Sequence, residues 1–247
     1  MKNITKTASK FRLVQSLAAF AAALTLPVSA ATWVGYLNVF QNNSGSLGSY
    51  IFGSDWGVSD LQTTLVTSNP GTLIGDELVL QPNFNVYKDA LGGTNSDRAF
   101  WTNSTDGGVT SGSAGNKWMD ANTFVEAESI TDSSFTLQGL VTSNTLDAAY
   151  QAEAFIKVLD PNNGYATILN ETIALPASGA FSVTANLSGY TGKLQQTGFR
   201  ISGLNANPAN ETSLGKISVT IVPEPSSLSL LGLGVLAMTC RQRRRVS

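Results

Sequence analysis

The chain of 247 residues contains no histidine, and its one cysteine is Cys240. Without histidine, the Ser-His-Asp and Cys-His nucleophilic mechanisms and the commonest zinc ligand are excluded. A single cysteine excludes a disulfide within the chain, so packing alone must stabilise the fold. Charged residues are also scarce, at 13% against an average of about 25%. These absences remove most familiar hydrolase designs.

The small net charge of −2 hides an uneven distribution of charge along the chain. Eight of the fifteen basic residues lie in two terminal segments, residues 2–12 and 241–245. The body between them keeps sixteen acidic and seven basic side chains, so its formal charge is −9. Such a surface repels phosphate backbones, and we therefore expect no nucleic acid partner.

The first 30 residues have the profile of a signal peptide. A basic opening precedes an apolar run at residues 13–26, which predicts a signal helix, and Pro27 then breaks it. Small residues follow, so we predict cleavage between Ala30 and Ala31. An uncleaved anchor is the alternative, but a run of about 14 residues is shorter than the roughly 20 needed to span a bilayer.

The C-terminal segment repeats these features in the opposite order. Pro223, Glu224 and Pro225 precede an apolar run at residues 227–240. Four basic residues follow it: Arg241, Arg243, Arg244 and Arg245. Because an arginine cluster is held on the cytoplasmic side of a membrane, the run predicts a short transmembrane helix with the body outside. An ordinary single-pass anchor is the alternative.

The segment at residues 222–247 resembles the PEP-CTERM sorting signal, which combines a Pro-Glu-Pro triplet, a short apolar span and a terminal arginine cluster. The resemblance implies a partner, exosortase, an integral-membrane enzyme of Gram-negative bacteria that removes such tails during export. It further implies a place at the cell envelope or surface, with membrane anchoring before the tail is processed. Genomes with this system often also encode exopolysaccharide production.

The body, residues 31–221, alternates apolar and polar residues in short bursts that predict strands. These bursts lie at residues 33–40, 61–67, 77–81, 123–128, 134–141, 150–159, 166–175, 180–185, 197–202 and 216–222. Turn signals separate them at residues 42–45, 69–71, 160–164 and 178–179. With no convincing amphipathic helix, the pattern predicts one all-β domain, an antiparallel, jelly-roll-like β-sandwich. A single-sheet barrel is the alternative, and a division into two domains is not required.

Residues 92–117 are rich in small polar residues and predict the longest loop. The second half of the body resembles, in its strand pattern, carbohydrate-binding-module jelly rolls that accompany PEP-CTERM tails. Residues 116–126, 154–160 and 198–205 carry this resemblance, which implies a fold and contains no catalytic motif.

Tryptophans are the candidate ligand contacts, because an indole can stack on the C–H face of a sugar ring. We predict such contacts at Trp56, Trp101 and Trp118 and treat Trp33 with them as the residues to inspect first. The alternative is that they fill the core of a sandwich.

Pairs of carboxylates could run glycoside hydrolysis without histidine. The candidate pairs are Asp55 with Asp60, Asp76 with Glu77, and Glu126 with Glu128. Only the last pair shares a strand face, so solvated surface acids are the better interpretation. We predict no cofactor, although loops at residues 96–97 and 105–107 offer oxygen ligands for a structural calcium ion.

These observations favour a non-enzymatic protein that is exported, sorted by exosortase and associated with extracellular polysaccharide or with the structure of the cell surface. The alternative is a lectin-like carbohydrate-binding module. A polysaccharide-active glycosidase or lyase ranks last.

Overall fold

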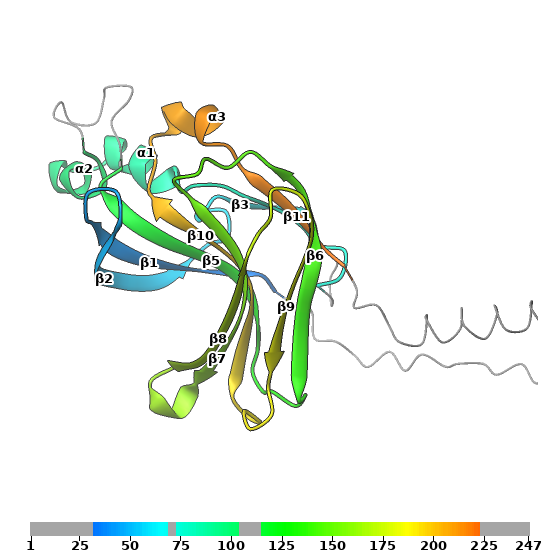
Figure 1. The fold of residues 1–247 in the computed structure, drawn as a ribbon. Helices are drawn as coiled ribbons and strands as arrows, with labels where there is room; N and C mark the ends of the chain where they lie inside the picture. Colours follow the sequence, from blue (N-terminus) through cyan, green and yellow to red (C-terminus); the bar gives the residue numbers. More distant parts are fainter. Residues whose placement is uncertain (1–31, 69–72, 104–114, 223–247) are drawn as a thin grey trace, which may run out of the picture.

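The computed structural model describes residues 32–68, 73–103 and 115–222, which form two antiparallel sheets packed face to face (Figure 1). Sheet A contains, in spatial order, β2 (Leu47–Trp56), β1 (Val34–Asn42), β5 (Lys117–Ala127), β10 (Leu194–Leu204), β7 (Gln151–Asp160) and β8 (Ala166–Ala174). Sheet B contains β3 (Thr63–Thr67), β4 (Glu77–Leu80), β11 (Ile217–Ile221), β6 (Ser134–Asn144) and β9 (Gly179–Asn186). The predicted all-β antiparallel sandwich is therefore confirmed, in preference to a single-sheet barrel.

The chain crosses from one sheet to the other at nearly every connection after β4. Sheet B takes the order β4-β11-β6-β9 and sheet A the order β5-β10-β7-β8, so only β7 and β8 are consecutive within a sheet. This wrapping of eight strands as two four-stranded layers is jelly-roll-like. The hairpin β1–β2 widens sheet A at its edge, and β3 widens sheet B.

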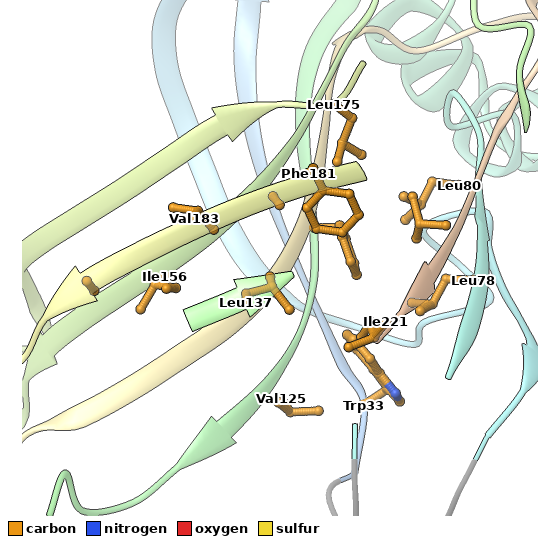
Figure 2. Packing of buried hydrophobic residues seen from close by; sticks show 14 of the residues in the cluster. Trp33, Leu78, Leu80, Val125, Leu137, Ile156, Leu175, Phe181, Val183 and Ile221 are labelled. Atoms are coloured by element: carbon orange, nitrogen blue, oxygen red, sulfur yellow. The ribbon is translucent and has the colours of Figure 1, made fainter. Parts of the chain in front are cut away.

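The main core lies between the two sheets (Figure 2). Leu137 and Phe181 from sheet B pack in the same cluster as Ile156 and Val125 from sheet A. Strand β9 alternates buried and exposed residues, because successive side chains of a strand point to opposite faces, whereas β5 and β7 also bury residues of their outer faces. Two apolar inner faces removed from water supply the dominant stabilisation of such a sandwich.

A second cluster covers the part of sheet A that extends past sheet B. Leu37 and Val39 of β1 pack there with Met119 of β5 and with Val86 of helix α1. The helices are α1 (Asn85–Gly92), α2 (Asn95–Trp101) and α3 (Glu211–Leu214), with short 3-10 turns η1 (Pro161–Asn163) and η2 (Pro208–Asn210). Figure 1 shows α1, α2 and α3 at one end of the sandwich, opposite the β7–β8 turn.

The structure departs from the sequence prediction at β2 and at two of these helices. β2 was not predicted, because its residues alternate poorly: it is an edge strand whose pairing with β1 is interrupted by register shifts. Residues 92–117 are not one long loop, since α2 occupies part of that segment. Thr94 and Asp97 form a capping box at its start, in which each side chain accepts a hydrogen bond from the other's backbone N–H.

Candidate functional site

The candidate site lies on the outer face of sheet A, the side turned away from sheet B. Strand alternation places Asp120, Asn122, Phe124 and Glu126 of β5 on this outer face, while Val125 points into the core. A groove of about 950 Å³ lies on it, with residues of β1, β2, β5, β7, β8, β10 and the β7–β8 turn in its lining. The outer face of sheet B differs, since Ser and Thr dominate it and Thr136 bonds to Thr184 across two strands.

The floor of the groove is aromatic because a glycine makes room for it. The register aligns Phe124 of β5, Gly198 of β10 and Phe155 of β7 in one row across sheet A. The two phenyl rings lie 6.3 Å apart between centroids, on either side of the glycine, and both residues are buried. A Cβ at Gly198 would lie 2.6 Å from Cα of Phe124. Only glycine fits this position without moving the neighbouring strand.

Lys157 extends its side chain over the row formed by Phe124, Gly198 and Phe155. It is paired with Gln196 in the sheet, yet its Nζ donates a 2.8 Å hydrogen bond to Oδ1 of Asn122, beyond the row of Gly198. The ammonium lies 4.3 Å from the centroid of the Phe155 ring, close enough for a cation–π contact. Burial lowers the pKa of Lys157 to about 8, and the nearby carboxylate of Asp120 opposes that shift.

The other cation of this region is enclosed by carboxylates. Arg200 of β10 forms a close ion pair with Glu153 of β7 and a second, 3.3 Å ion pair with Asp120 of β5. Ser202 adds a 2.9 Å hydrogen bond to Asp120. Pairs held across three adjacent strands in this way fix the relative positions of β5, β10 and β7.

Two tyrosines contribute to the lining from different elements. Tyr36 comes from β1, where Asp55 of β2 is its direct cross-strand partner, and both residues line the groove. Burial raises the pKa of Tyr36, with smaller contributions from the charges of Tyr50 and Asp55. Tyr165 follows the predicted turn at residues 160–164, and its φ of 59° places it in the left-handed region. It remains 60% exposed.

The structure does not bring the predicted tryptophans together on one surface. Trp56 and Trp101 are partly buried against the second cluster, on the inner side of sheet A. Trp33 belongs to the main core. Trp118 alone lies on the outer face, in a row with Phe40 of β1, outside the groove lining.

The exposed end of that row is Tyr50 of β2, which pairs with Phe40. Their rings meet edge to face, with centroids 5.6 Å apart. We call the row of Phe40, Tyr50 and Trp118 the aromatic row. Trp56 is the last residue of β2.

The predicted carboxylate pairs are placed differently from one another. Asp55 and Glu126 both line the groove, but Glu126 accepts a 2.9 Å hydrogen bond from Gln196, and its predicted partner Glu128 lies beyond the end of β5. Asp60 lies in a turn after β2. The prediction of a solvated acid is wrong for Asp76, which is 1% exposed.

The buried Asp76 joins the two ends of the described body. Its Oδ2 accepts a 2.7 Å hydrogen bond from Nε1 of Trp33, near the start of β1. Its backbone oxygen accepts from the backbone N–H of Ile221 at the end of β11. Figure 2 shows Trp33 beside Ile221 in the core. The residues next to the predicted signal peptide and next to the Pro-Glu-Pro triplet therefore leave the body at the same place.

Of the two predicted calcium loops, only residues 96–97 lie in the part of the chain that the structure describes. Asp97 accepts hydrogen bonds from the backbone and hydroxyl of Thr94, which lower its pKa. Residues 105–107 lie outside the described residues. Among residues 32–68, 73–103 and 115–222, no group of three or more Asp, Glu, His or Cys side chains is arranged to hold a metal ion.

Lys157, Asn122, Tyr36 and Tyr165 were not singled out from the sequence. One signal was available for Lys157, a charge between Ile156 and Val158 in the otherwise apolar run from Ala154 to Leu159. Its significance depends on the position of Gly198, 41 positions along the chain. The spacing of residues along the sequence does not predict that Lys157 and Gly198 lie close together.

Several predicted features lie outside the described residues: cleavage at Ala30–Ala31, the triplet Pro223–Glu224–Pro225, the apolar run at 227–240 and the arginine cluster. Within the described ranges, no helix is long and apolar enough to span a bilayer.

Comparisons with known proteins bear on the C-terminal segment only. Searches of curated proteins and of solved structures returned no match. The family description "PEP-CTERM protein-sorting motif" matches residues 222–245, the segment that begins where β11 ends. The chain thus carries a PEP-CTERM sorting motif behind an antiparallel β-sandwich, which indicates an exported protein of the cell envelope or surface with exosortase as its processing partner.

Proposed function

We propose that the β-sandwich is a non-enzymatic module that associates with extracellular polysaccharide at the surface of a Gram-negative cell, and that the groove on the outer face of sheet A is its contact site. The short apolar run at residues 227–240 acts as a transient membrane anchor until exosortase removes it. The observation that carries the proposal is the lining of the groove, which brings aromatic side chains together with uncharged polar and a few charged ones.

The composition of the lining suits a hydroxyl-rich ligand. Tyr36 and Tyr165 offer aromatic surface, which can pack against the apolar face of a sugar ring. Asn38 and Gln196 offer amide groups that donate and accept hydrogen bonds. Concave sites with apolar walls and a few fixed polar groups are the usual form of a small-ligand site.

The absence of histidine from the sequence supports a non-enzymatic role. Glu126, the acid of the predicted pair that reaches the groove, is engaged by Gln196 rather than facing a second acid of that pair. A hydrolase or lyase activity of the processed protein on any polysaccharide that it binds would contradict this part of the proposal.

The test uses the processed protein, recovered from cells with exosortase, in a glycan array and in affinity electrophoresis. Tyr165→Ala should weaken binding at least tenfold, because it removes an exposed aromatic wall of the groove. Tyr50→Ala is the matched control, with the same substitution at a similar exposure of 58%, on β2 and outside the groove. Retained binding by Tyr165→Ala would exclude the groove.

The lectin-like alternative has one specific feature in its favour, the aromatic row of Phe40, Tyr50 and Trp118 on the outer face. If Tyr50→Ala and Trp118→Ala abolish binding while Tyr165→Ala does not, this row is the contact site. If the wild-type protein binds no glycan, both sites are excluded, and the body has a structural role at the surface.

A further inference from the structure

We infer that the groove selects an uncharged glycan and discriminates against acidic polysaccharides, an inference that rests on the proposed function. It concerns the charges of the outer face and which of them remain available to a ligand. The argument depends on the partners of each ionisable side chain in and beside the groove.

Both cations of this region are already engaged by the protein. The ammonium of Lys157 bonds to Asn122 and lies against the Phe155 ring. The guanidinium of Arg200 is held between Asp120 and Glu153. To bind a sugar carboxylate or sulfate, either cation would have to leave these partners, and the carboxylates beside Arg200 would then be left without a counter-ion.

The charge that remains available in the groove is negative. Asp55 lines the groove, is exposed, and makes no hydrogen bond or ion pair within the described residues. Counting Asp55, Asp120, Glu126 and Glu153 against Lys157 and Arg200 gives this face a net charge of −2. An acidic polymer therefore meets repulsion here, in addition to the net negative charge of the whole body.

The uncharged groups of the groove are the ones free to bind. The hydroxyls of Tyr36, Tyr165 and Thr167 and the amide of Asn38 line it and make no side-chain hydrogen bond to another described residue. They can donate to and accept from sugar hydroxyls, and Asp55 can accept from them. This set suits a neutral, hydroxyl-rich chain better than an acidic one.

The experiment compares three polymers of different charge by affinity electrophoresis of the processed protein: a neutral glucan, acidic alginate and cationic chitosan. We expect the glucan to bind more tightly than alginate at low salt, and any binding of chitosan to weaken as added salt screens its attraction to the net negative body. Raising the ionic strength should strengthen any weak binding of alginate, because salt screens the repulsion.

A variant isolates the role of Asp55. Asp55→Asn should improve alginate binding by about two- to fivefold, the effect expected of one charge near the protein surface, and should change glucan binding little. Glu77→Gln removes the same charge from an exposed position on sheet B and should leave alginate binding unchanged.

The outcomes separate this inference from the proposed function. Preferential binding of alginate over the glucan overturns the discrimination against acidic polysaccharides but leaves a polysaccharide-binding groove in place. Equal alginate binding by wild type, Asp55→Asn and Glu77→Gln also overturns it. Binding to none of the polymers, nor to any glycan on the array, overturns the proposed function itself.

Discussion

The indole Nε1 of Trp33 donates a 2.7 Å hydrogen bond to the buried carboxylate of Asp76, 43 residues along the chain. Trp33 also stacks near Phe199, with ring centroids 6.3 Å apart. This contact attaches the start of β1 to the segment before β4, which in turn bonds to the end of β11. The two ends of the described body, next to Trp33 and at Ile221, are thus anchored to the core at one point.

Trp33→Phe should lower the free energy of unfolding by about 2–4 kcal/mol, because it removes apolar volume and a hydrogen bond to a charged group. Urea denaturation of the processed protein measures the change. Trp56→Phe is the matched control: Trp56 is partly buried and its Nε1 bonds to the hydroxyl of Ser54, so we expect a loss of about 1 kcal/mol. Equal losses would show that the contact with Asp76 has no special weight.

Gly198→Ala should destabilise the protein by about 3 kcal/mol or more, because the added Cβ collides with the backbone of β5. The same urea titration measures it. Gly92→Ala provides the control, since a Cβ at Gly92 meets nothing within 4 Å and lies at the end of α1. That change should shift stability by no more than about 1 kcal/mol. A neutral Gly198→Ala would contradict the close packing of β10 against β5.

Lys157 should make stability rise between pH 8 and pH 10. Its pKa is about 8 in the folded protein, against 10.5 for an unperturbed lysine, so in this window the unfolded state binds more protons than the folded state. Stability therefore increases with pH, by about 3 kcal/mol at most. The raised pKa of Tyr150, about 12, acts in the opposite sense only from about pH 10 upward.

Lys157→Met removes this titration and keeps a long apolar side chain over Phe155. Urea titrations at pH 7, 8, 9 and 10 should show a smaller rise than in the wild type. Lys88→Met, at an exposed position of α1, should keep the wild-type rise. Parallel profiles of wild type and Lys157→Met would sink the idea of a desolvated ammonium at the groove.

Replacing Pro223, Glu224 and Pro225 together by alanine should block tail removal, because these residues form the triplet of the matched motif. Intact mass and envelope fractionation measure the effect. The variant should accumulate in the membrane fraction at the mass that the wild-type protein has in cells without exosortase. Normal processing of the variant would contradict recognition through the triplet.

Signal-peptide cleavage should leave Ala31 as the first residue of the mature protein. Ala30→Leu should prevent or shift cleavage, since a signal peptidase reads small residues before the cut. N-terminal sequencing of the exported protein distinguishes the two forms. Thr32→Leu, two positions further on, should be cleaved normally, and an exported protein that retains Met1 would refute the prediction.

Strands with a clean alternation were predictable because burial on one face imposes a period of two on the sequence, as β9 and β11 show. β2 was not predicted, because an edge strand with register shifts does not need that period. α1 was not predicted, because its eight residues bury only Val86, Tyr87 and Ala90 and so give a short helical pattern. The sequence does contain one signal for the start of α2, the capping residues Thr94 and Asp97.

The sequence by itself determined the sorting motif, because such a motif is a contiguous string in which a Pro-Glu-Pro triplet, an apolar run and arginines follow one another. It also determined the all-β class, through local alternation. Only the tertiary structure decided which side chains share the groove. Lys157, Gly198 and Asn122 come from three strands, and their proximity depends on strand order and register, which residue spacing along one strand does not specify.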